Sequence, residues 1–169
     1  VDGQDHLIVM QENARGLLEK GELEEALALL EQIIEEYPQF WSAYNNLALA
    51  YFYKGNLTEA RDVLEEVLDK NPGNLHALCN LLVFFHYENN VKEMNELANR
   101  LEKVTPILVE HRYKLGATFG LIGRHELSYK WLRSLQKNGF QGDGTFYFWL
   151  ANAAYQTERF TVAEQAWSK

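Results

Sequence analysis

Apolar residues recur along the chain at the spacing of one helix face, stop at a short break, and then recur. Within residues 41–74 this helical spacing runs over positions 44–51 and again over 60–68. No alternating run bounded by hairpin turns indicates a strand. The pattern predicts first helices near 7–20, 41–54, 75–88 and 108–121, and second helices near 22–36, 58–70, 91–104 and 125–137.

Two kinds of turn residue follow one common period. The three prolines, Pro38, Pro72 and Pro106, are each 34 residues apart. A second column with the same step contains Gly21, Gly55, Asn89 and Gly123. Asparagine replaces glycine well where φ must be positive, so the column predicts the turn between the helices of each pair. A period of this length indicates a stacked array of repeats.

These residues resemble the tetratricopeptide repeat family, whose unit is a helix–turn–helix of 34 residues. Residues 41–74 carry the pattern most fully, with Tyr44, Leu47, Ala48, Tyr51, Gly55, Ala60, Leu64, Val67 and Pro72. The resemblance covers residues 7–169. It implies an all-α fold, a right-handed superhelix (α-solenoid) of antiparallel helix–turn–helix tetratricopeptide repeats.

Five repeats follow from this resemblance, at residues 7–40, 41–74, 75–108, 109–143 and 144–169, with the last one truncated. One extra residue in the loop 137–144 shifts the fifth repeat, whose last helix is expected to start near Phe160. Thr58 is the expected N-cap of its helix. Residues 1–6 are expected to be an N-terminal extension or a remnant of cloning, and the chain an excerpt from a longer protein.

Composition narrows the function classes. Apolar residues make up 47% of the chain, charged residues 24%, and the formal net charge is −8, which is typical of a folded protein without a basic nucleic-acid surface. Apolar runs are too short for membrane insertion. The single cysteine excludes an intrachain disulfide and a multi-cysteine zinc site. Residues 1–6 lack the features of a secretory signal, and a cytoplasmic location is expected.

Function depends on the surface that the first helices present. One stripe per first helix, spaced i, i+4, i+7, i+11, is expected to line the concave groove. The expected peptide-binding residues of this stripe and its flank are Asn45, Asn46, Leu49, Tyr53, His76, Asn80, Tyr87, Tyr113 and Lys114. An asparagine amide donates and accepts, so Asn46 and Asn80 suit a peptide backbone. The tyrosines add rigid amphipathic area. The alternative is that these are polar residues of a solvated face.

The expected partner is another protein, bound through a peptide segment across repeats two to four of a non-catalytic scaffold. Some family members grip acidic C-terminal tails with Lys, Asn and Arg. Here Glu110 would repel such a tail, so we expect a different ligand. The alternative function is a self-assembly or regulatory domain of a larger polypeptide, which packs through the uncapped end near Trp167.

Enzyme, cofactor and metal signals are weak. His76 and Cys79 lie three residues apart, but their helical register and that of His86 spread the three side chains, and no acidic residue completes a metal set. The glycine-rich loop 139–144 follows a helix and lacks the lysine of a phosphate cradle. No catalytic residue, no metal site and no cofactor are therefore expected.

Overall fold

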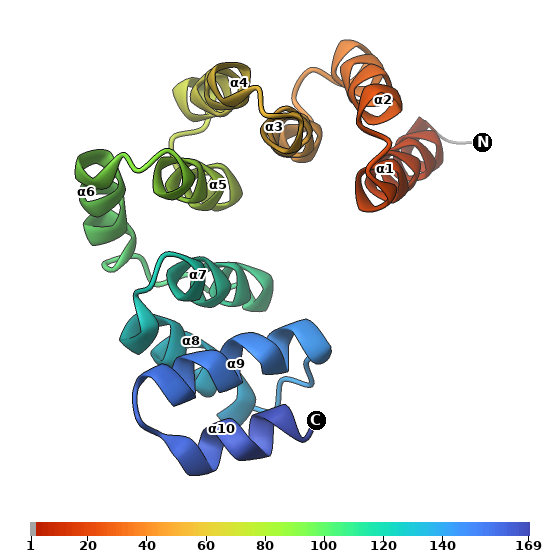
Figure 1. The fold of residues 1–169 in the computed structure, drawn as a ribbon. Coiled ribbons are helices and arrows are strands. Elements are labelled where there is room, and N and C mark those ends of the chain that lie inside the picture. The colour runs from red at the N-terminus through yellow and green to blue at the C-terminus, as the bar shows by residue number, and fades with distance from the viewer. Residues whose placement is uncertain (1–2) are drawn as a thin grey trace. The chain divides into compact units, whose positions relative to one another are not determined.

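The computed structural model describes residues 3–169, and these residues form ten α-helices without a strand (Figure 1). The helices are α1 (Gly3–Lys20), α2 (Leu23–Glu36), α3 (Trp41–Lys54), α4 (Leu57–Lys70), α5 (Leu75–Tyr87), α6 (Val91–Leu101), α7 (Val109–Leu121), α8 (His125–Lys137), α9 (Gly144–Gln156) and α10 (Phe160–Trp167). The all-α arrangement of helical pairs predicted from the sequence is confirmed. Within residues 3–169, none of the helices combines the length and the apolar character that a membrane span requires.

Most helix boundaries lie within one residue of the prediction, and two differ by more. α1 begins at Gly3, a turn earlier than expected, and the Tyr37 hydroxyl donates to the Gly3 carbonyl at 3.1 Å. Of the expected extension 1–6, residues 1 and 2 lie outside the described residues. α6 ends at Leu101 rather than near 104, because the chain passes into turns ahead of Pro106, which disfavours helix before it.

The turns within the pairs use left-handed backbone, as the glycine column predicts. Gly55 has a φ of 87° and Asn89 a φ of 55°. The amide of Asn56 then donates to the carbonyl of Tyr51 at 2.8 Å, which satisfies a carbonyl at the end of α3. The column continues into the fifth repeat at Glu158, with a φ of 61°.

The expected N-cap at Thr58 is wrong. α4 begins at Leu57, so Asn56 is its N-cap, and no side chain bonds the first amides. The backbone turn already positions the helix start, so the helix begins two residues after Gly55. Side chains cap α5 and α9: Asn74 accepts from the Ala77 amide at 2.9 Å in α5, and Asp143 accepts from the Phe146 amide at 2.9 Å in α9.

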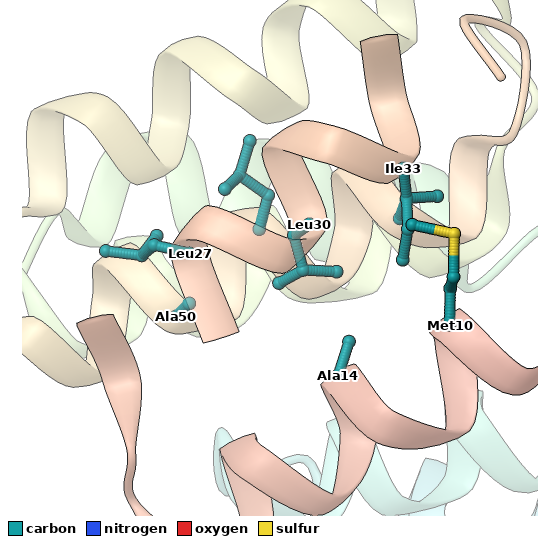
Figure 2. Close-up of a cluster of buried hydrophobic side chains, with 8 residues drawn as sticks. Met10, Ala14, Leu27, Leu30, Ile33 and Ala50 are labelled. Carbon is teal, nitrogen blue, oxygen red and sulfur yellow. The ribbon is translucent and has the colours of Figure 1, made fainter. Parts of the chain in front are cut away.

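The described residues divide into two compact units, an N-terminal unit up to Phe84 and a C-terminal unit from Phe85 to Lys169. In the N-terminal unit α2 packs against α1 and α3, and α3 packs against α4. Figure 2 shows the core cluster between the first three helices. Its fully or nearly fully buried side chains are Met10, Ala14, Leu27, Leu30, Ile33, Ala43, Leu47 and Ala50.

In the C-terminal unit α8 packs between α7 and α9, and α10 packs against α9. The buried cluster contains Leu132, Leu135, Phe146, Leu150, Ala151 and Ala166. Aromatic rings surround it: Phe146 lies 4.9 Å from Phe140 and 5.3 Å from Tyr147, measured between ring centroids. This core is therefore more aromatic than that of the N-terminal unit.

Candidate functional site

The predicted stripe of the N-terminal unit lies on α3, beside α1. The Gln11 amide donates to the Ser42 hydroxyl at 2.9 Å, which joins the two first helices on this face. Farther along α3, Asn46 and Leu49 are half-buried, and Tyr53 is exposed at 59%. One amide, one aliphatic and one aromatic group thus follow each other at helical spacing on the surface.

The neighbouring stripe of α1 is charged. Arg15 lies between Glu12 at 2.6 Å and Glu19 at 3.6 Å, and all three side chains are exposed. The hydrogen bond and the charge of Glu12, followed by the charge of Glu19, raise the pKa of the Arg15 guanidinium. This stripe offers a partner a solvated charge network next to the α3 stripe.

Asn45 and Asn80 are buried. Asn45 is 8% exposed, and its amide donates to the side-chain oxygen of Asn74 at 3.3 Å, the atom that caps α5. The Asn45 oxygen is buried and has no hydrogen-bond partner among the described residues. On α5, Asn80 is 3% exposed and His76 is half-buried. Asn45 thus helps to hold the start of α5, and of the three predicted asparagines Asn46 is the one that is not buried.

In the C-terminal unit, Tyr87 ends α5 and is exposed, with its ring 5.6 Å from that of His86 in an edge-on arrangement. Tyr113 of α7 is half-buried instead, at 5.5 Å from the Phe146 ring. Burial, followed by the charge of Asp143, raises the pKa of the Tyr113 phenol. Lys114 is the next residue of α7 and is half-buried.

A cavity at the start of α7 was not predicted from the sequence. Its volume is about 530 Å³, and its lining consists of Leu108, Val109, Glu110, Tyr113 and Phe140. Leu108 and Val109 are exposed apolar residues directly after Ile107, which is 86% exposed. The sequence does contain a signal for this cavity, because three consecutive apolar residues follow Pro106. Such a run is unusual on a protein surface.

Comparisons with known proteins agree on the family. The model of the tetratricopeptide repeat family matches residues 12–74. The TPR repeat-containing protein YvcD of Bacillus subtilis (strain 168) is 57% identical over 166 residues. This match covers 98% of the chain, and the chain spans about one third of the length of that relative, 34%.

Two solved structures show the same fold. A structure described as the functional characterisation of Pseudomonas aeruginosa pilF has a TM-score of 0.67 and 18% identity, and the match covers 99% of this chain and 76% of that one. A tetratricopeptide repeat protein from Parabacteroides merdae has a TM-score of 0.58 and 16% identity, with 95% and 62% covered.

Proteins with tetratricopeptide repeats bind other proteins, and their fold is generally non-catalytic. The 34-residue period, the ten helices and the relatives all agree with this family. The chain is a tetratricopeptide repeat protein, with about four and a half to five repeats.

Proposed function

We propose that the first helices of this chain bind an extended peptide segment of another protein, so that the chain serves as an interaction scaffold. The observation that carries the proposal is the surface of α3, where the half-buried Asn46 and Leu49 and the exposed Tyr53 lie on one stripe. An extended peptide needs hydrogen-bonding groups for its backbone and apolar surface for its side chains. The α3 stripe offers both.

Each group of the stripe has a distinct role in this proposal. The Asn46 amide donates to and accepts from a peptide unit of the partner. Leu49 and the Tyr53 ring contact apolar side chains, and a tyrosine loses little conformational entropy when it is buried. Asn45 and Asn80 act indirectly, because their burial leaves them as supports of α3 and α5. We include His76, which is half-buried on α5, in the proposed binding surface.

The C-terminal unit adds an apolar pocket to the proposal. The cavity beside Tyr113 is large enough for an apolar side chain of the bound segment. Lys114 lies next to it in sequence and binds an acidic group of the partner, and Tyr87 contributes exposed aromatic surface. A partner with an apolar anchor near an acidic residue therefore fits this unit.

Selection from a displayed library of random peptides, followed by fluorescence anisotropy, tests the proposal. We expect the selected peptides to lose at least about tenfold in affinity for Asn46→Ala/Tyr53→Ala, since each group is worth about 1 kcal/mol or more at a hot spot. The matched control is Glu25→Ala/Gln32→Ala on α2, where both residues are exposed. Equal losses in both variants, or none, would contradict the proposal.

A second candidate function is self-assembly through the outer face of α9 and α10. Tyr155, Phe160 and Trp167 are all at least half exposed there, and the Tyr155 ring lies 5.6 Å from both other rings. Trp167 occupies the repeat position at which Leu30, Leu64, Ala98 and Leu132 are fully buried. An aromatic residue at a packing position favours contact of this face with a helix of a second copy. If the chain self-assembles through this face, light scattering of the original protein should give a molar mass that rises with concentration, and Trp167→Ser/Phe160→Ser should lower this mass.

The proposal also includes a cytoplasmic location. It is supported by the single cysteine, because a protein of a reducing compartment does not depend on disulfides. Cell fractionation followed by immunoblotting of the native protein tests it, and recovery in the secreted fraction would contradict it.

A further inference from the structure

The outer surface of α8 carries a cavity lined by basic and neutral polar side chains. Its volume is about 430 Å³, and its lining consists of Tyr129, Lys130, Arg133, Ser134, Lys137 and Asn138. No carboxylate belongs to this lining. Lys130, Arg133 and Lys137 follow the i, i+3, i+7 spacing of one helix face, so they form a single stripe, the basic α8 stripe.

The basic α8 stripe has little internal neutralisation. Glu126 is the acidic residue of α8, and it pairs with Arg159 at 3.0 Å. Arg133 donates to the neutral amide oxygen of Gln136, and its Nε is buried without a hydrogen-bond partner among the described residues. A guanidinium with an unmet donor in a cavity without carboxylates favours an incoming acceptor oxygen.

The same repeat positions have the opposite charge two periods earlier. Subtracting 68 residues from Lys130, Arg133 and Lys137 leads to Asp62, Glu65 and Asp69 of α4, all exposed. We call these three residues the acidic α4 stripe. One period further back, on α2, the stripe is weaker, with Ala28, Glu31 and Glu35. Every copy of the chain therefore carries a basic stripe and an acidic stripe of identical spacing.

We propose that the basic α8 stripe of one copy binds the acidic α4 stripe of a second copy. Identical spacing lets two helices lie along each other with all three charges opposed, and charge complementarity of this kind selects partner and register. The acidic α4 stripe exceeds the α2 stripe by one carboxylate, which makes α4 the better occupant. This surface differs from the α3 stripe and from the aromatic face of α9 and α10.

Exposed ion pairs are individually weak, so the expected association is weak and sensitive to salt. The screening length falls from about 30 Å at 0.01 M salt to about 10 Å at 0.1 M. We therefore expect the dissociation constant to rise steeply over this range. An association through apolar surface would respond little to such a change.

Sedimentation velocity with two charge-reversed variants at low salt tests the proposal. Variant one is Lys130→Glu/Arg133→Glu/Lys137→Glu, and variant two is Asp62→Lys/Glu65→Lys/Asp69→Lys. We expect each alone to lose at least about tenfold in self-association, and an equimolar mixture of the two to regain it, because opposite stripes meet again. The control Glu31→Lys/Glu35→Lys on α2 should associate like the original protein.

The results separate the proposal from its competitors. A protein that stays monomeric at low salt, or a mixture that does not regain association, would overturn it. Association lost instead in Trp167→Ser would assign the contact to the aromatic face. Circular dichroism checks that both variants fold. Both variants should keep their affinity for the peptides selected on the α3 stripe. Peptide binding and self-association are therefore tested by separate measurements, and one proposal can fail without the other.

Discussion

The cores of the two units follow one repeat plan but fill it with different side chains. In the N-terminal unit Ala43 and Ala48 are buried where α2, α3 and α4 approach each other. In the C-terminal unit the position of Ala43 is held in the fifth repeat by Phe146, which is fully buried, and the position of Ala48 is held in the fourth repeat by the buried Gly116. The two units thus place side chains of different size at the same positions of the repeat, a phenylalanine in place of one alanine and a glycine in place of another.

The difference shows how local packing limits exchange between repeats. A Cβ on Gly116 would lie 2.6 Å from Cδ2 of Leu132 and 2.8 Å from its Cγ. Ala48, at the same position of repeat two, carries that atom and is fully buried. Equivalent positions are therefore interchangeable only together with the side chains that face them.

Removal of the Phe146 ring should have the largest effect on the stability of the fold. We expect Phe146→Ala to lower the free energy of unfolding by about 3–5 kcal/mol, since the side chain is fully buried and the cavity would not close. Urea unfolding measures it. Phe148→Ala is the control on the same helix, where the ring is half exposed, and its effect should stay within about 0.5 kcal/mol. Equal effects would contradict the described core.

Two glycine substitutions should change the free energy of unfolding in opposite directions. Gly116→Ala forces the Leu132 side chain to move and should destabilise by about 1–3 kcal/mol. Gly16→Ala in α1 meets open space and should stabilise by about 0.5–1 kcal/mol, because alanine is the better helix former. Thermal unfolding of both variants checks this. A stabilising Gly116→Ala would show that α7 and α8 are packed less tightly than described.

The two side-chain caps should differ in strength. Asp143→Ala removes the cap of α9 and should cost about 1 kcal/mol. Asn74→Ala removes the cap of α5 and also the acceptor of the buried Asn45 amide, so we expect a loss of about 2 kcal/mol. Chemical unfolding of both variants gives the comparison. A smaller loss in Asn74→Ala than in Asp143→Ala would exclude the coupling between Asn45 and Asn74.

The smallest expected effect is a loss of stability at alkaline pH. Burial raises the pKa of the phenols of Tyr51 and Tyr113, with further contributions from Glu31 in one unit and Asp143 in the other. The folded protein holds these protons more tightly than the unfolded chain. Their contribution is therefore complete below the ordinary tyrosine pKa of about 10 and is lost as pH rises through the raised values.

Ultraviolet absorbance of phenolate checks this order of titration. Tyr51→Phe and Tyr113→Phe should each remove part of the latest-titrating absorbance, and Asp143→Asn should move the Tyr113 titration to lower pH. If Tyr113→Phe removed early-titrating absorbance instead, the described burial of its ring would be wrong.

Helix positions were predictable because a turn residue recurs at the same position of every repeat. The positive φ of Gly55 and Asn89 follows from their column, and the helices before these turns, α3 and α5, end within one residue of the prediction. The N-cap prediction at Thr58 was wrong because it rested on residue type alone. Residue type does not show whether the backbone turn already positions the start of the helix.

The candidate site was less predictable than the fold. Sequence spacing placed Asn45, Asn46 and Asn80 close to one stripe, but the burial of Asn45 and Asn80 depends on neighbouring helices. The cavity beside Tyr113 is equally non-local, because Phe140 reaches it from the loop before α9. The net charge of −8 does not show where the charges lie, and only a comparison position by position shows the inversion between α4 and α8.

Site-specific photo-crosslinking tests most directly whether partners bind along the first helices. A benzophenone amino acid in place of Tyr53 lies on the α3 stripe, and one in place of Glu59 lies on α4; both positions are exposed. We predict that selected peptides, and proteins from native lysate that these peptides compete for, crosslink at position 53 and not at position 59. Equal crosslinking at both positions, or crosslinking at 59 alone, would contradict a binding face on the first helices.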